Sequence, residues 1–160
     1  MNPYLLSNHG PLSFEFVTDQ GVIYNATFFD YNTSLPGYPE LAEAIYSFTL
    51  DIILEINDTP LRPDERLGET IVAIFMKFFN SRQNVVVYVC DSSDDRHLAR
   101  KRKFDFWFWK YNDGTILKVD SLAVIEDMEI YNSVLVHKDN VNATRIIEGF
   151  YLLNEKAEEK

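Results

Sequence analysis

Three aspartates lie where a run of apolar residues ends, and carboxylates in such a cluster can hold a metal ion. Residues 84–90 form the apolar run, and Asp91, Asp94 and Asp95 follow it. Ligands of open α/β sheets gather beyond the carboxyl ends of strands, and Mg²⁺ prefers carboxylate oxygens. One interpretation is a metal-dependent enzyme acting on phosphate esters. Further charged residues would support it: Asp120, Glu126, Asp127, Arg96 and Arg100. The residue types favour the alternative, in which Ser and Asp cap a helix and Asp91 and Asp94 pair with Arg96 or Arg100. Ser92 or Ser93 is the expected cap, and Ser92 and Asp95 have the spacing of a capping box.

A basic cluster follows at residues 96–103, where six of the eight side chains are Arg, Lys or His. Trp107 and Trp109 come soon after it, and bases beside aromatic residues are typical of surfaces that contact phosphate. The net charge of −10 makes nucleic acid an unfavourable partner, because an acidic chain repels a polyanion. We therefore expect either a solvated helix face or a site for an anionic small molecule.

Signatures of several other enzyme classes are missing from the sequence. The three histidines, His9, His97 and His137, do not have zinc-ligand spacing. The sequence contains no Gly-x-Ser-x-Gly, Walker-type or Gly-x-Gly-x-x-Gly motif. The single Cys90 lies in an apolar run, where cysteine behaves as a small hydrophobe. We therefore predict no metal site built from histidine or cysteine.

Length and composition predict one folded domain. The chain has 160 residues, of which 46% are apolar and 14% aromatic, whereas disordered chains are poor in aromatic residues. We expect a globular domain over residues 1–155 and a charged tail over residues 156–160. The sequence shows no signal-peptide pattern and no apolar run of about 20 residues, which predicts a cytoplasmic protein without membrane contact.

The hydrophobic pattern predicts an α+β fold with a mixed, mostly antiparallel sheet and flanking helices, in the order β-β-β-α-β-α-β-β-α. An extended segment at residues 1–12 precedes these elements. Residues 93–111 fit a helix better than a strand over 104–111, because Phe104, Trp107, Phe108 and Tyr111 share one helix face. The predicted strands cover residues 14–18, 22–31, 44–56, 84–90, 115–125 and 131–137, and the turn Asp19-Gln20-Gly21 joins the first two. The other helices cover 64–80, with Asp64 as the expected N-cap, and 140–155.

The residues around Gly68 resemble the coenzyme A motif of GNAT-type N-acyltransferases, Gln/Arg-x-x-Gly-x-Gly/Ala. The equivalent stretch is Glu65-Arg66-Leu67-Gly68-Glu69-Thr70, in which Gly68 matches and Thr70 stands at the last position. The element order is also that of the second half of these enzymes. The resemblance implies a coenzyme A site in which backbone N–H groups hold the pyrophosphate. The implied cofactor-binding residues are Arg66, Gly68, Thr70, Arg96 and Arg100. The alternative is that Gly68 packs the helix against its neighbours.

A second acyltransferase motif, Asn-x-x-Ala-x-x-x-Tyr-x-x-x-Gly-Phe, matches less well. Its Asn, Ala and Tyr positions correspond to Arg96, Ala99 and Lys103, and the Gly-Phe pair to Trp107 and Phe108. Ala99 and Phe108 agree with the motif, whereas the tyrosine that acts as general acid is absent from its usual place. The resemblance therefore implies a fold more strongly than an activity.

Three further stretches resemble an uncharacterised family of small proteins from Bacteroidetes-type bacteria. They are RLGETI, YVCDSSDDRHLARKR with the following Phe104 and Trp107, and LVHKDN. We expect a bacterial cytoplasmic protein of acyltransferase-like fold that serves as a binding or interaction module with a degenerate cofactor site. The alternatives are an active acyl-CoA-dependent N-acyltransferase and the metal-dependent phosphoesterase described above. The expected partners are an anionic small molecule and a protein partner or second copy of the chain.

Overall fold

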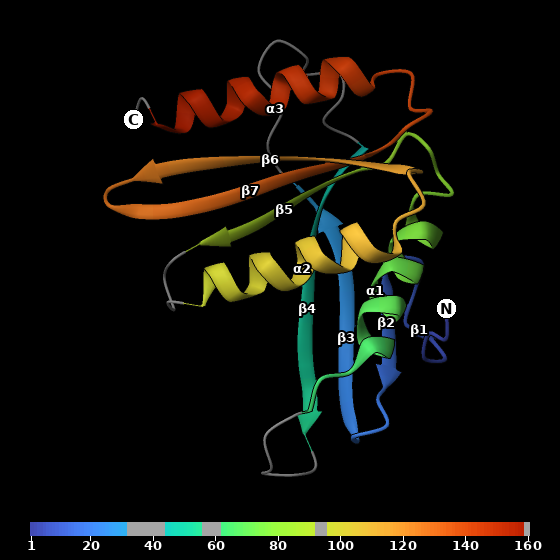
Figure 1. Cartoon of the computed structure of the whole chain (residues 1–160). Coiled ribbons are helices and arrows are strands. Elements are labelled where there is room, and N and C mark those ends of the chain that lie inside the picture. The colour runs from blue at the N-terminus through green and yellow to red at the C-terminus, as the bar shows by residue number, and fades with distance from the viewer. Residues whose placement is uncertain (32–43, 56–61, 92–95, 159–160) are drawn as a thin grey trace.

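Figure 1 presents the computed structural model, which describes residues 1–31, 44–55, 62–91 and 96–158. The fold is α+β, with a mixed, mostly antiparallel sheet and three helices, as predicted. The strands are β1 (Ser7–Asn8), β2 (Ser13–Val17), β3 (Val22–Asp30), β4 (Ile45–Glu55), β5 (Val85–Asp91), β6 (Ile116–Ile125) and β7 (Met128–His137). The helices are α1 (Glu65–Phe78), α2 (His97–Tyr111) and α3 (Ala143–Glu158).

Two local expectations are corrected. The segment predicted to be merely extended contributes β1, whose two residues pair with β2. The helix expected from about residue 93 begins at His97, and Arg96 before it makes no side-chain cap hydrogen bond. The predicted capping residues, Ser92 and Asp95, lie outside the described residues. The alternative strand over 104–111 is wrong, because buried aromatic residues on one face of α2 pack on the sheet and on α1.

The sheet has the strand order β1-β2-β3-β4-β5-β7-β6 and consists of two antiparallel parts. They meet at one parallel contact, in which Ile45 to Ser47 of β4 pair with Val85 to Val87 of β5. Beyond that contact β4 continues beside β3 and β5 continues beside β7. The two parts diverge, as Figure 1 shows, so β4 and β5 separate toward their carboxyl ends.

The helices cover opposite faces of the sheet. On one face α1 and α2 bury an aromatic core, in which the Phe75 ring lies 4.7 Å from Phe48 and 5.7 Å from Phe104, centroid to centroid. On the other face α3 packs Ile146 and Phe150 against valines of β5 and β7. No helix in the described part of the chain has the length and apolar character needed to cross a membrane.

Candidate functional site

The first turn of α1 is fixed by Asp64, as its position before the helical pattern predicts. The Asp64 carboxylate accepts a hydrogen bond of 3.0 Å from the backbone N–H of Arg66, which is otherwise without a partner in a helix first turn. The sequence expectation that Asp64 caps this helix is therefore confirmed. Because α1 starts here, the residues of the predicted coenzyme A motif lie in its first two turns.

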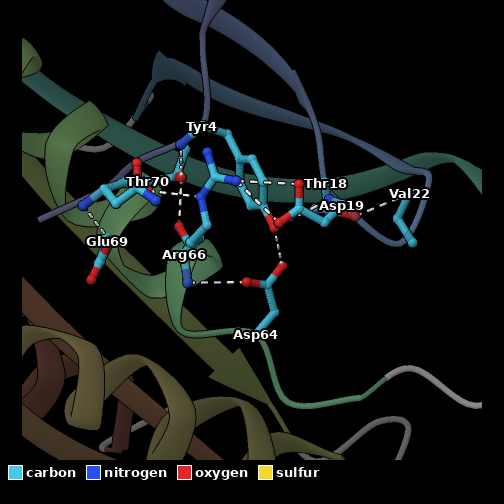
Figure 2. Close-up of polar contacts among 9 residues, drawn as sticks. Tyr4, Thr18, Asp19, Val22, Asp64, Arg66, Glu69 and Thr70 are labelled. Carbon is cyan, nitrogen blue, oxygen red and sulfur yellow. Dashed lines mark hydrogen bonds and ion pairs between the residues drawn. The ribbon is translucent and has the colours of Figure 1, made fainter.

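One flank of these turns is covered by residues 2–4, which we name the N-terminal strap (Figure 2). The Tyr4 N–H donates to the Thr70 hydroxyl at 2.8 Å in a buried position, and the Asn2 N–H donates to the Glu69 carboxylate at 2.5 Å. The Arg66 guanidinium donates to the Asn2 carbonyl at 2.9 Å. The side chains of Arg66 and Thr70 are thus engaged in hydrogen bonds with the strap.

The Tyr4 side chain ties the strap to the helix cap and to the turn between β2 and β3. Its hydroxyl donates to Asp64 at 2.7 Å and accepts from the Asp19 N–H at 3.2 Å. The Arg66 guanidinium lies 4.0 Å from the Tyr4 ring centroid and pairs with Asp19 at 3.0 Å. Burial of the phenol, with the Asp64 hydrogen bond and the nearby carboxylates, raises the pKa of Tyr4 to about 12.

Gly68 allows α1 and α2 to approach each other closely. A Cβ atom at Gly68 would lie 2.3 Å from Trp107 Cδ1 and 2.6 Å from Trp107 Nε1, which is closer than real Cβ contacts. Both residues are buried. The absence of a side chain at Gly68 is therefore explained by the indole that lies on it. A diphosphate would have to displace this indole to reach the same face of the helix.

On the flank opposite the strap, a cleft of about 550 Å³ opens between the start of α1, the second half of α2 and the hairpin of β2 and β3. We name it the α1–α2 cleft. Its lining is mainly apolar and aromatic and includes three basic residues and two carboxylates. The lining residues are Thr18, Gln20, Val22, Tyr24, Arg62, Pro63, Asp64, Glu65, Leu67, Lys103, Phe106, Trp107, Lys110 and Tyr111.

Two lysines give the cleft its chemical character. The Lys103 ammonium lies 5.3 Å from the Trp107 ring centroid, and the Lys110 ammonium lies 5.3 Å from that of Tyr111. A contact with the Tyr111 side chain and the charge of Glu65, 3.7 Å away, raise the pKa of Lys110. Lysine side chains carry a positive charge at neutral pH, so the cleft can hold an anionic group beside an aromatic wall.

The predicted site residues do not all meet in the cleft. Arg66, Gly68 and Thr70 belong to α1 but do not line the cleft, because Arg66 and Thr70 contact the strap and Gly68 contacts Trp107. Arg96 precedes α2 and Arg100 lies in its first turn, whereas the cleft is lined by residues from Lys103 onward. With a rise of about 1.5 Å per residue, Arg96 and Lys110 are ~20 Å apart along the helix axis.

The predicted acidic site is only partly described. Asp94, Asp95 and the Asp91 side chain lie outside the described residues. Among the residues that are described, no group of three His, Cys, Asp or Glu side chains is placed to hold a metal ion. Asp120 accepts a 2.5 Å hydrogen bond from Ser133 and pairs with Lys118. Burial acts to raise the pKa of Asp120, but these two partners outweigh it and lower that pKa.

Sequence reasoning missed most of the cleft. Lys103 was part of the predicted basic cluster, but its grouping with Trp107 and Lys110 was not predicted. These three side chains follow the i, i+4, i+7 spacing of one helix side, so this part of the signal was present in the sequence. The contributions of Thr18 and Gln20 depend on tertiary packing across about 45 residues of chain and leave no local pattern.

The comparison with known families concerns the second half of the site. A family model described as "Family of unknown function (DUF6169)" matches residues 63–152, from the start of α1 into α3. The match therefore includes the contact between Gly68 and Trp107 but not the β2–β3 side of the cleft. No curated protein and no solved structure matches the chain. Because the matched range covers more than half of the sequence, the chain belongs to the DUF6169 family, whose function is unknown.

Proposed function

We propose that this protein is a binding module of acyltransferase-like fold whose α1–α2 cleft takes an anionic ligand with an apolar or aromatic part. The observation that carries the proposal is the placement of Lys103 and Lys110 on one side of a cleft walled by Trp107. The cleft volume of about 550 Å³ is within the usual range for small-molecule sites.

The arrangement of elements supports a relationship to GNAT-type acyltransferases. After an antiparallel meander comes a helix, then a strand, a second helix and a final hairpin, as in the second half of those enzymes. We propose a bacterial cytoplasmic protein that kept this arrangement and lost the usual cofactor cradle. The Trp107 indole on Gly68 supports the loss, because it occupies the helix face that a pyrophosphate would need.

Coenzyme A species remain candidate ligands under this proposal, with a different set of contacts. Their phosphates would meet Arg62, Lys103 and Lys110 at the rim of the cleft, and an apolar portion would lie against Trp107 and Phe106. Arg66, Gly68 and Thr70 would act by fixing the wall of the cleft. The other two candidate residues, Arg96 and Arg100, would bind an anion only at the far end of α2.

An active acyl-CoA-dependent N-acyltransferase is the second candidate, and one observation favours it. Tyr111 lines the same cleft, so the cleft contains a phenol, about two helical turns beyond Lys103, which stands at the position of the acyltransferases' general acid. The phenol can protonate the thiolate that leaves when an amine attacks the thioester. In this case the purified protein would release free coenzyme A from acetyl-CoA in the presence of an amine, and Tyr111→Phe would abolish the release.

Thermal unfolding with anionic probes tests the binding proposal. Acetyl-CoA and inorganic pyrophosphate should each raise the melting temperature, because a ligand at about 100 times its Kd stabilises the folded state by ~2.7 kcal/mol. The double variant Lys103→Ala/Lys110→Ala should lose this shift, whereas Lys77→Ala, a lysine of α1 outside the cleft, should retain it. No shift with either probe at millimolar concentration, or an equal shift in the double variant, would contradict the proposal.

A further inference from the structure

The two edges of the sheet are protected very differently. One edge is β1, which is only two residues long and is followed by Gly10 with a φ of 102°. The other edge is β6, which has ten residues and pairs with β7 alone among the described strands. Natural proteins keep edge strands short or interrupted because an open edge templates pairing with another strand. The β6 edge lacks both of these protections.

The hydrogen-bond pattern identifies the backbone groups that β6 presents. The Lys138 N–H donates to the Thr115 carbonyl at 2.9 Å, at the start of the ladder with β7. In an antiparallel pair, residues that exchange hydrogen bonds alternate with residues whose backbone groups point away. The register then places the N–H and C=O groups of Lys118, Asp120, Leu122 and Val124 on the outer edge. The Asn112 side chain, which donates to the Ile116 carbonyl at 2.7 Å, fits the same alternation.

The side chains beside this edge are apolar where the hairpin projects from the body. Leu122 is 44% exposed and Val124 is 51% exposed, although both lie in a regular strand. The charged residues within β6 are Lys118 and Asp120, so the strand has no net charge in a chain of net charge −10. Pairing along β6 therefore avoids the repulsion that most other surfaces of two copies would meet.

We infer that β6 is a self-association edge, through which two copies of the chain pair antiparallel and continue one sheet across a twofold axis. An antiparallel pair of identical strands is self-complementary, as a closed twofold interface requires. The charges select this direction over the parallel one. Glu126 and Asp127 form the tip of the β6–β7 hairpin, and Lys118 and Lys138 lie toward its base. Antiparallel pairing places the acidic tip of one hairpin beside the basic base of the other. Parallel pairing would place the two acidic tips side by side, where they repel each other.

The same symmetry brings further apolar surface together. A twofold axis that joins two sheet edges in this way keeps the α3 helices of both copies on the same face. Contacts of α3 reach β6, and α3 leaves 47% of Tyr151 and 41% of Leu152 exposed. A strand pair alone buries little area, and apolar side chains of the two α3 helices would add burial of the kind that stable dimers need.

Sedimentation velocity with two β6 variants tests the inference. Leu122→Pro removes one outward N–H and leaves the ladder to β7 intact, since proline is tolerated where the N–H faces away from the sheet. Leu122→Lys adds the charge by which natural edges prevent pairing. Val17→Lys, at a position of β2 that is 53% exposed, is the matched control. Circular dichroism checks that each variant keeps its fold.

The wild-type chain should sediment at about twice its mass of 18.7 kDa at micromolar concentration and above. The control Val17→Lys should do the same, and both Leu122 variants should sediment as folded monomers. A wild-type monomer up to submillimolar concentration would overturn the inference, and so would a dimer that persists in Leu122→Pro and Leu122→Lys. Because none of these residues lines the α1–α2 cleft, ligand binding by the monomeric variants separates this test from the proposed function.

Discussion

On the strap side of α1, almost every polar group has a partner within the chain. The Tyr4 N–H and hydroxyl, the Arg66 guanidinium and the Thr70 hydroxyl form one connected set of hydrogen bonds. On the cleft side of the same turns, Lys103 and Lys110 lie over aromatic rings, with one ion pair of 3.7 Å to Glu65. Polar groups that have hydrogen-bond partners within the chain stabilise the fold. Cations beside exposed apolar surface can still bind an anionic ligand. We therefore propose that the strap side stabilises the fold and that the cleft side binds a ligand.

The largest loss of stability should come from disrupting the contact between Gly68 and Trp107, which lies between the strap side and the cleft side of α1. Gly68→Val places new atoms where the Trp107 indole lies, and overpacking of this kind costs about 1–3 kcal/mol. The measurement is the urea midpoint of unfolding. Ala73→Val introduces the same β-branched residue elsewhere in α1 and should cost less. Helix propensity alone favours valine over glycine, so a Gly68→Val variant that loses no more stability than Ala73→Val would contradict the account of the Trp107 contact.

The second-largest loss of stability should come from a substitution that breaks the contact between the strap and α1. Thr70→Val leaves the buried Tyr4 N–H without its acceptor, and we expect a loss of about 1–3 kcal/mol in the free energy of unfolding. Thr144→Val, at an exposed position of α3, is the control and should be close to neutral. Ligand-induced shifts should persist in Thr70→Val, since its hydroxyl faces the strap. A Thr70→Val variant as stable as wild type would show that the hydrogen bond between Tyr4 and Thr70 does not stabilise the fold.

Alkaline pH should weaken the strap through Tyr4. The folded-state pKa of Tyr4 is about 12 against an ordinary value of 10.0, so the folded state holds this proton more tightly than the unfolded state does. The resulting stabilisation is complete below pH 10 and is lost as the pH rises toward 12. Other groups titrate in this range, so the quantity to measure is the difference in stability between wild type and Tyr4→Phe. A difference that does not shrink between these pH values would contradict the assignment.

The smallest effect on stability should come from the cleft lysines. Lys103→Ala/Lys110→Ala removes exposed ammonium groups whose contacts with rings and with Glu65 are solvated, so the unfolding midpoint should stay close to that of wild type. A strongly lowered midpoint would mean that these lysines hold the two helices together. The contrast between this variant and Thr70→Val is the direct comparison of the two sides.

Local patterns predicted the elements better than the site. Asp64 before a helical repeat predicted the start of α1, and the spacing of Phe104, Trp107 and Phe108 predicted α2. The two-residue strand β1 was missed because pairing so short leaves no alternation to detect. The β2 and β3 hairpin was predicted from its Asp19-Gln20-Gly21 turn, in agreement with a φ of 79° at Gly21.

The cleft could be predicted only in part, for a physical reason. Sequence spacing shows which residues share a helix side, but not which other element lies against that side. The acyltransferase motif drew attention to Gly68, where the structure has Trp107 on the glycine. The basic cluster drew attention to Arg96 and Arg100, whereas the cleft uses the later turns of α2. Both differences depend on how α1 and α2 cross, which no single segment encodes.

The most direct test of the central claim is a fluorescence titration in which Trp107 reports on the cleft. The chain has two tryptophans, and Trp109 is 80% exposed on the outer side of α2, so Trp109→Phe leaves Trp107 as the single reporter. Acetyl-CoA or pyrophosphate should change its emission saturably, with binding weakened by salt and reduced at least about tenfold by Lys103→Ala/Lys110→Ala. Emission that does not change, or equal affinity with and without the two lysines, would contradict the assignment of the cleft as an anion-binding site.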